Sequence, residues 1–157
     1  MGHVGRFFRQ KNHDFLLDVF ERIVQKREKS ALLLVGDGEL LSGIKEKVEE
    51  KGLIRKVIFA GTRSDVNKIL SAFDVFVFPS FYEGMPNTVI EAEANGLPCV
   101  ISSSITNDAK ILNNIIYISL DDDPEKWANT ALSLQREEDA TDTLKRSGYD
   151  IQQCVAA

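Results

Sequence analysis

The sequence has few cysteines, few prolines and no long hydrophobic run. Its 157 residues include two cysteines and four prolines. Two cysteines are too few for a disulfide framework, and they lack the paired spacing of a zinc site. The longest apolar runs, residues 31–35 and 75–78, are far shorter than the ~20 residues that cross a bilayer. We therefore expect a protein of a reducing, cytoplasmic setting, with no metal site and no transmembrane segment.

An excess of positive charge is also missing. Nineteen Lys and Arg residues stand against twenty-four Asp and Glu, which gives a net charge of -5. Bulk charge therefore disfavours nucleic acid as a partner, and any anion must be bound locally. The composition is otherwise that of an ordinary globular domain, with 43% hydrophobic and 27% charged residues. At this length a chain buries enough surface for a proper core.

Short apolar runs alternate with stretches of helical periodicity along the chain. The pattern predicts strands near residues 1–4, 31–35, 57–60, 75–78, 99–101 and 115–118, and helices near 12–25, 40–48, 65–70, 88–95 and 123–134. Strands that are buried on both faces and alternate with helices imply a parallel sheet. The predicted fold is α/β, a three-layer Rossmann-like parallel sheet with helices on both faces. It spans residues 1–136, and residues 137–157 are expected to form a C-terminal helix or tail.

The ends of the predicted elements carry further signals. Asn12, Asp65 and Asp123 each precede a helical stretch and are suitable N-cap residues. Only four residues precede Gly5, so the first strand is expected to be short and to leave an exposed sheet edge. This short start favours the interpretation that the domain is cut from something longer.

Parallel sheets bind ligands beyond the carboxyl ends of their strands, which directs attention to the loops there. Arg6 and Lys11 follow the first strand and flank a helix N-terminus, where they could clamp a diphosphate. A merely solvated basic loop is the alternative, and Arg9 is a weaker candidate. The turn at residues 36–38, Gly-Asp-Gly, could border a nucleotide or only permit a tight turn. It is not a dinucleotide fingerprint, because Leu41 stands where the third glycine belongs.

The strongest candidate constellation has two glutamates. Glu83 follows a buried strand and Glu91 lies about one turn into the next helix, so both carboxylates can face one cleft. A carboxylate accepts hydrogen bonds from vicinal hydroxyls, which suits a ribose or a sugar. Gly84 allows close backbone approach, and the amides of residues 85–88 could meet a ligand. Ordinary solvated acids are the alternative, with Glu93 equally eligible, and a glycosidase pair fits poorly because nothing places the acids across one bond.

Four other residues are weaker candidates for chemistry. Cys99 is interpreted as a buried strand residue and Trp127 as core. His3 and His13 could in principle act as bases. A phospho-acceptor domain would need clustered acids after the first strand, where this chain is basic.

Taken together, the motifs resemble one family. Residues 83–91 begin and end with glutamate, and residues 91–100 continue Glu-Ala-x-Ala-x-Gly-x-Pro-x-Val. This stretch closely resembles the Glu-x7-Glu signature and tail of the retaining glycosyltransferases of family 4, also called group 1. Residues 4–11 resemble the Gly-Arg and Lys element of that family, residues 35–38 its Gly-x-Gly turn, and residues 57–61 its Val-x-Phe-x-Gly strand. The five elements occur in the order found in the family.

The resemblance implies roles for individual residues. Arg6 and Lys11 would hold the diphosphate of a nucleotide-sugar and stabilise the leaving nucleotide without a metal or other cofactor. Glu83 would position the transferred sugar, and Glu91 would bind the ribose. The other implied contacts are Gly84, Met85, Pro86 and Asn87 with the sugar, the Thr88 and Val89 amides with the phosphates, Gly5 beside Arg6, and Gly36, Gly38, Gly61 and Arg63 with the base.

At the level of the whole protein, the resemblance implies the C-terminal, nucleotide-sugar-binding half of a GT-B enzyme. Such an enzyme would build polysaccharide or glycoconjugate at the inner face of the membrane, most often from a UDP-sugar. Its saccharide or lipid-linked acceptor would be held by a missing N-terminal domain, so the chain alone would be incompletely active. Residues 102–108 depart from the family's Asp- and Gly-rich loop. A non-catalytic α/β binding module of the same descent is the alternative.

Overall fold

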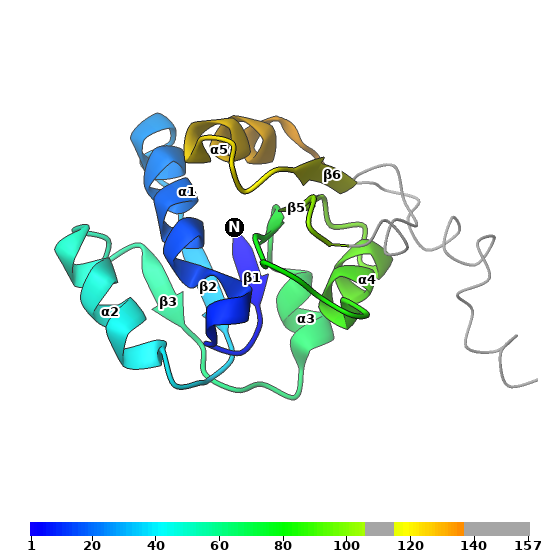
Figure 1. The fold of residues 1–157 in the computed structure, drawn as a ribbon, viewed down its shortest axis with the longest axis horizontal. Helices are drawn as coiled ribbons and strands as arrows, with labels where there is room; N and C mark the ends of the chain where they lie inside the picture. The colour runs from blue at the N-terminus through cyan, green and yellow to red at the C-terminus, as the bar shows by residue number, and fades with distance from the viewer. Residues whose placement is uncertain (106–114, 137–157) are drawn as a thin grey trace, which may run out of the picture.

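Six short apolar runs form a parallel sheet in the computed structural model, which describes residues 1–105 and 115–136 (Figure 1). The strand order is β3-β2-β1-β4-β5-β6, and every neighbouring pair is parallel. This arrangement confirms the α/β prediction. The strands are β1 (Gly2–Val4), β2 (Leu32–Val35), β3 (Val57–Phe59), β4 (Phe76–Phe78), β5 (Cys99–Ser102) and β6 (Ile115–Ile118).

Helices cover both faces of the sheet, which gives the three predicted layers (Figure 1). Because side chains alternate along a strand, Leu34 packs with the core under α1, α2 and α5, whereas Val35 packs with the core under α3 and α4. Trp127 is fully buried in the first of these cores, as expected. The helices are α1 (His13–Lys26), α2 (Leu41–Glu50), α3 (Val66–Leu70), α4 (Asn87–Ala94) and α5 (Pro124–Ser133), and a short 3-10 helix, η1 (Arg9–Lys11), precedes α1.

The short first strand does not form a sheet edge, and that prediction is wrong. β1 lies in the middle of the sheet, where Gly2 pairs with Leu33 on one side and Phe76 on the other. The outer strands are β3 and β6. Their exposure also corrects the expectation that every strand is doubly buried, because Ile58 is 54% exposed and Ile116 is 37% exposed.

The predicted helix caps have different outcomes. Asp123 caps α5, since its Oδ1 accepts a hydrogen bond from the Glu125 amide at 2.8 Å. Asn12 precedes α1 but adopts a left-handed conformation with φ of 54°, and its side chain makes no capping bond. Asp65 precedes α3 without capping it, because its carboxylate binds the guanidinium of Arg63.

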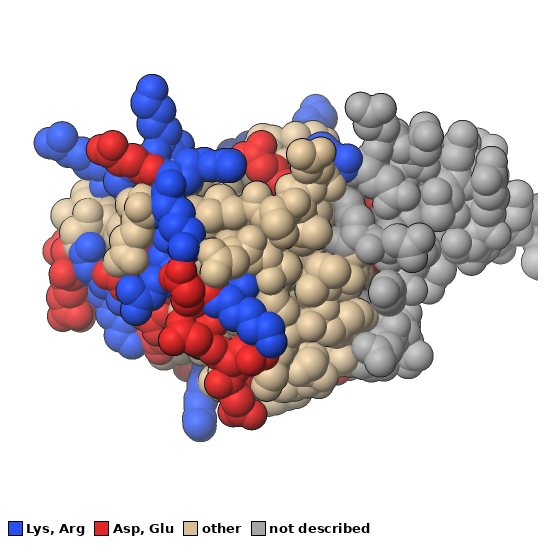
Figure 2. All heavy atoms as spheres, turned by 90° about the horizontal axis from the view of Figure 1, so that it is seen from above, with Lys and Arg blue, Asp and Glu red and all other residues tan. Residues whose placement is uncertain are grey.

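Ion pairs connect α1 to α2 on the outer surface. Lys47 binds Asp14, and Lys51 Nζ lies 2.8 Å from both Asp18 and Glu21. In Figure 2, blue and red side chains accordingly lie side by side over the left half of the molecule. These pairs lie at the surface, with side chains that are 26–57% exposed, so each contributes only ~0.2–1 kcal/mol to stability.

Arg136 connects the end of the described chain to α3 and α4. Its guanidinium donates hydrogen bonds to the carbonyls of Asn95, Leu70 and Phe73 at 2.5, 2.9 and 2.9 Å. The predicted tail, residues 137–157, and residues 106–108 of the serine-rich loop lie outside the described residues. Within the described part, no helix has the length and apolar character that a membrane span requires.

Candidate functional site

A cavity of about 650 Å³ lies beyond the carboxyl ends of β1 and β2 and reaches Thr88 of α4. The strand order reverses next to it, between β1 and β4, because the connection from β1 leads through α1 to β2 and the connection from β4 leads through α4 to β5. This switch point is the usual ligand position in open α/β sheets. We call it the strand-end cavity. It is lined by Val4, Gly5, Arg6, Lys11, Val35, Gly36, Asp37, Gly38, Thr62, Arg63, Val66 and Thr88.

Two glycines of this cavity have a packing reason that is independent of any ligand. The loop after β1 lies directly on the turn after β2, with Phe7 N donating to Asp37 O at 3.0 Å. A Cβ atom on Gly36 would lie 2.1 Å from the Gly5 carbonyl oxygen, and one on Gly38 would lie 2.7 Å from the Phe7 carbonyl oxygen. The tight-turn interpretation of residues 36–38 is therefore sufficient to explain these glycines, although both also line the cavity.

The two predicted phosphate ligands differ in their surroundings. Arg6 is exposed, and its guanidinium carbon lies 4.4 Å from the centre of the Phe8 ring. Lys11 is largely buried, and its Nζ donates to Glu83 Oε1 at 2.7 Å and lies 4.7 Å from the centre of the Phe78 ring. Lys11 therefore connects the strand-end cavity to the loop that begins the Glu-x7-Glu segment.

Two further hydrogen bonds hold the same two loops together. Phe81 N donates to Gln10 O at 2.9 Å, and Gln10 Nε2 donates to Tyr82 O at 2.9 Å. Together with the Lys11 and Glu83 pair, they join two consecutive positions of the first loop, residues 10–11, to three consecutive positions of the second, residues 81–83. We call these three contacts the loop clasp. They place Glu83, which does not itself line the strand-end cavity, next to a residue that does.

The start of α4 offers fewer amides than the sequence predicted. The Asn87 amide donates to Met85 O and the Val89 amide donates to Pro86 O, both at 2.9 Å. The Val89 amide is thus used within the helix start and its side chain is buried in the core, so its contact with the phosphates stays a prediction. The Thr88 amide has no acceptor among the described residues, and Thr88 lines the cavity.

The structure distinguishes the two glutamates of α4 that the sequence left equivalent. Glu93 is fully buried, whereas Glu91 is exposed. Glu91 lies three residues after Thr88, so the two side chains share one face of the helix. Glu91 therefore lies on the cavity side, one turn beyond its rim. On the preceding loop, Met85 is 66% exposed, Pro86 is buried and a Cβ atom on Gly84 would meet no atom within 4 Å.

On the opposite rim, Arg63 lines the cavity and is already paired. It binds Asp65 through two hydrogen bonds of 2.8 Å, which raise the pKa of the guanidinium and lower the pKa of the carboxyl group. Gly61 supports this rim through its carbonyl, which accepts from Gly36 N at 2.9 Å. The sequence did not single out three further lining residues, Asp37, Thr62 and Val66. The first two are neighbours in sequence of the predicted residues at 36, 38, 61 and 63.

Neither histidine lines the cavity, so a role as catalytic base gains no support. His3 and His13 are both buried, with ring centres 4.9 Å apart. Burial lowers the pKa of His3 well below its usual value and that of His13 to about 4. His3 Nδ1 donates to the Val77 carbonyl at 2.9 Å. Cys99 is buried in β5, where desolvation raises the pKa of its thiol.

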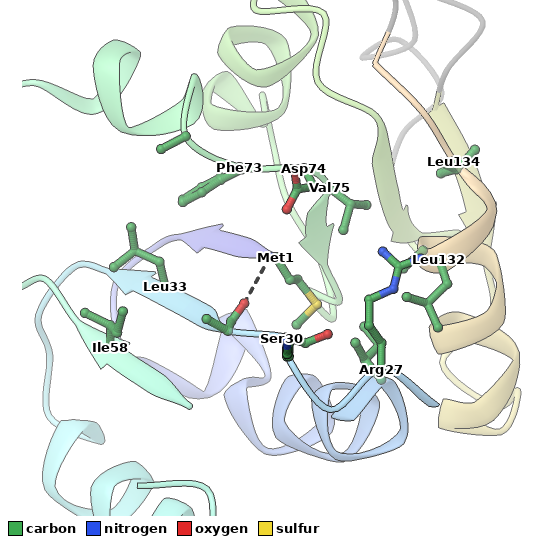
Figure 3. A pocket seen from close by; sticks show the side chains of 15 residues that line it. Met1, Arg27, Ser30, Leu33, Ile58, Phe73, Asp74, Val75, Leu132 and Leu134 are labelled. Atoms are coloured by element: carbon green, nitrogen blue, oxygen red, sulfur yellow. Dashed lines mark hydrogen bonds between the residues drawn. The ribbon is translucent and has the colours of Figure 1, made fainter. Parts of the chain in front are cut away.

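A second cavity of about 480 Å³ lies at the opposite edge of the sheet, by the amino ends of β1 and β2 (Figure 3). The Met1 amino group there donates to the Ala31 carbonyl at 3.0 Å, and Leu33, Ile58 and Leu132 contribute apolar walls. None of the predicted site residues lines it. Ligands of parallel sheets bind at the other edge.

Comparison with known proteins identifies the family. The family model named Glycosyl transferases group 1 matches residues 1–137. The chain belongs to this family. EpsF of Bacillus subtilis, which is named as a glycosyltransferase, is 39% identical to this group 1 chain over 163 aligned residues, covering 100% of the chain and 42% of EpsF. An Escherichia coli enzyme named UDP-Gal:alpha-D-GlcNAc-diphosphoundecaprenol alpha-1,3-galactosyltransferase is 36% identical over 113 residues, covering 70% of the chain and 29% of the enzyme.

Solved structures show the same fold as this group 1 chain. TarM of S. aureus superimposes with a TM-score of 0.86 at 23% identity, covering 99% of the chain and 33% of TarM. HepE of Anabaena, solved in complex with UDP, superimposes with a TM-score of 0.76 at 21% identity, covering 99% of the chain and 46% of HepE. The chain thus spans less than half of each relative named here. EpsF and the Escherichia coli enzyme are both named as transferases, which does not favour the alternative of a non-catalytic module.

Proposed function

We propose that the strand-end cavity binds the nucleotide-diphospho-sugar of a retaining glycosyltransferase of family 4, and that this chain is its C-terminal half. One observation carries the proposal. Lys11 lines a cavity of nucleotide size at the switch point of the sheet and binds Glu83, the first residue of the Glu-x7-Glu segment. The proposed diphosphate and sugar sites would thus be adjacent, joined by this ion pair.

The proposed chemistry is charge stabilisation. When the bond between the anomeric carbon and the diphosphate oxygen breaks, negative charge accumulates on the leaving phosphate. Arg6, Lys11 and Thr88 all line the cavity, so the guanidinium, the ammonium and the Thr88 amide would stabilise that charge. We propose no metal ion or other cofactor for this step, because two cations and a helix N-terminus supply the positive charge.

The remaining parts of the sugar nucleotide are assigned by exclusion and position. Glu91 is the α4 carboxylate that faces the cavity side, so we propose it as the ribose ligand. The base would lie against the rim at residues 61–63 and the apolar side chains of Val35 and Val66. Glu83 and residues 84–87 would position the transferred sugar. Uridine is the first base to test, because one relative is named for a UDP-sugar and another was solved with UDP.

At the level of the whole protein, we propose polysaccharide or glycoconjugate synthesis at the cytoplasmic face of the membrane. Relatives include the Vi polysaccharide biosynthesis protein of Salmonella typhi, which is 34% identical over 123 residues. The saccharide or lipid-linked acceptor would be held largely by a further N-terminal domain. The chain alone would then bind the nucleotide-sugar and transfer the sugar poorly.

An NMR titration of the labelled chain with UDP, GDP and ADP tests the proposal. We expect saturable shifts at Arg6, Lys11 and residues 83–91 with one preferred nucleotide. Arg6→Ala should weaken binding about 10- to 100-fold, because it removes a charge-assisted hydrogen bond to phosphate. Glu91→Ala should also weaken the nucleotide, whereas the matched control Arg22→Ala, an exposed arginine on α1, should not. The absence of chemical-shift changes with all three nucleotides contradicts the proposal.

A further inference from the structure

The loop after β1, which lines the strand-end cavity, also lines a smaller cavity. This second site has a volume of about 310 Å³ and is lined by Arg9, Gln10, Phe81 and Tyr82. We propose that it binds a pyranose ring of the acceptor saccharide and call it the clasp cavity. The inference rests on the proposed function, since an acceptor has meaning only for a transferase.

The lining residues have the chemistry that a sugar ring requires. Phe81 is 42% exposed and Tyr82 is 65% exposed, although large aromatic side chains are normally covered. A pyranose presents C–H groups on its ring faces, which pack on aromatic surfaces, and hydroxyls on its edge. Arg9 supplies N–H donors to such hydroxyls, and Gln10 Oε1 is an acceptor whose amide nitrogen is already held by Tyr82 O. A few polar groups among apolar walls are typical of a small-molecule site.

The loop clasp makes this cavity a preformed feature of the fold. The bonds from Phe81 N to Gln10 O and from Gln10 Nε2 to Tyr82 O run directly between the two segments that form its walls. A cavity whose walls are bonded to each other loses little entropy on binding. The backbone that carries the two aromatic side chains is therefore held next to Gln10 before any saccharide arrives.

The position of the clasp cavity suits an acceptor. Gln10 adjoins Lys11 and Tyr82 adjoins Glu83 in sequence, and Lys11 and Glu83 form the ion pair at the edge of the strand-end cavity. Glycosyl transfer requires the acceptor hydroxyl and the anomeric carbon to approach within ~3–3.5 Å. Two sugar sites that adjoin the same ion pair satisfy that need, because a saccharide longer than one ring can extend from one site to the other.

The test is an NMR titration of the labelled chain with simple saccharides, with and without saturating UDP. The probes are the methyl α-glycosides of glucose, galactose and N-acetylglucosamine, taken to millimolar concentrations. We expect saturable shifts at Arg9, Gln10, Phe81 and Tyr82 that persist when UDP occupies the strand-end cavity. Tyr82→Ala should weaken saccharide binding at least about fivefold, Tyr82→Phe should preserve it, and Ile58→Ala, an exposed apolar residue on β3, should not affect it.

The outcomes separate this inference from the proposed function. UDP shifts without any saccharide shift at the four lining residues overturn the inference and leave the proposed function standing. Saccharide shifts that disappear with UDP also overturn it, because the probe then occupies the site of the transferred sugar. If the chain binds a saccharide but none of the nucleotides, the acceptor role of the clasp cavity is overturned. Binding of anionic vesicles that depends on Tyr82, without a saccharide shift, would assign the exposed rings to a membrane surface instead.

Discussion

The ion pair between Lys11 and Glu83 should contribute more to stability than the surface ion pairs of the same chain. Its Nζ to Oε1 distance is 2.7 Å, and the two side chains are only 16% and 9% exposed. At that distance the Coulomb attraction is about 6 kcal/mol for an effective dielectric constant of ~20. Desolvation and the ordering of both side chains offset most of it. We therefore expect a coupling energy of about 1.5–3 kcal/mol between the two residues.

A double-mutant cycle measures this coupling. Lys11→Met, Glu83→Gln and the double variant would be unfolded in urea, and the free energies of unfolding compared with that of the unmodified chain. The matched control is the pair of Lys47 with Asp14, whose side chains are 48% and 57% exposed. There we expect ~0.2–1 kcal/mol that falls further in 1 M salt, whereas the Lys11 and Glu83 coupling should persist. A coupling below about 0.5 kcal/mol would refute the claim that the two loops are held by this pair.

Three further predictions concern the site, the termination of the described chain and the buried histidines. Gly84→Ala should change the free energy of unfolding by less than about 0.5 kcal/mol, because a Cβ atom there meets no atom within 4 Å. If Gly84 contacts the transferred sugar, calorimetric titration of the variant should show weaker binding of a UDP-sugar but unchanged binding of UDP. Arg136→Met should lower the free energy of unfolding, measured in urea, by about 1.5–3 kcal/mol, since three carbonyls lose a charged hydrogen-bond donor. A loss under about 0.5 kcal/mol would show that water replaces the guanidinium as the donor. Burial lowers the pKa of His13 from 6.5 to about 4, so the folded state favours the neutral imidazole. As the pH drops from about 6.5 toward 4, the unfolded state binds a proton before the folded state does, and the free energy of unfolding should fall by roughly 2–3 kcal/mol. His13→Phe should reduce that pH dependence in urea titrations, and an unchanged slope would show that His13 is not its source.

The layered fold was predictable from the sequence because it depends on local signals. Apolar runs such as residues 31–35 and 75–78 are long enough to identify strands, and periodic stretches such as residues 12–25 identify helices. The strand order is not a local property. Nothing within residues 1–4 indicates that β1 pairs on both sides, because one of its neighbours, β4, begins only at residue 76.

The site shows the same limit in finer detail. Lys11 and Glu83 were each predicted as functional residues, but their ion pair joins positions 72 residues apart and depends on how two loops meet. Asp65 was predicted to cap a helix, and a guanidinium two residues away proved the better partner for its carboxylate. The Val89 amide gives a third example, since it donates to the Pro86 carbonyl. Residue types do not specify which amides at the start of a helix are bonded within it.

The central place of β1 has a consequence for synthesis on the ribosome. The second side of β1 can pair only after Phe76 has been translated, 74 positions after Gly2. At about 5–20 residues per second this delay is roughly 4 to 15 s. Until β4 is made, the edge of β1 is unpaired in addition to that of β3, and an unpaired strand edge is a template for aggregation. Substitutions that weaken the single paired position between β1 and β4 should therefore lower the yield of folded protein in cells more than they lower the affinity of the finished molecule for its ligands.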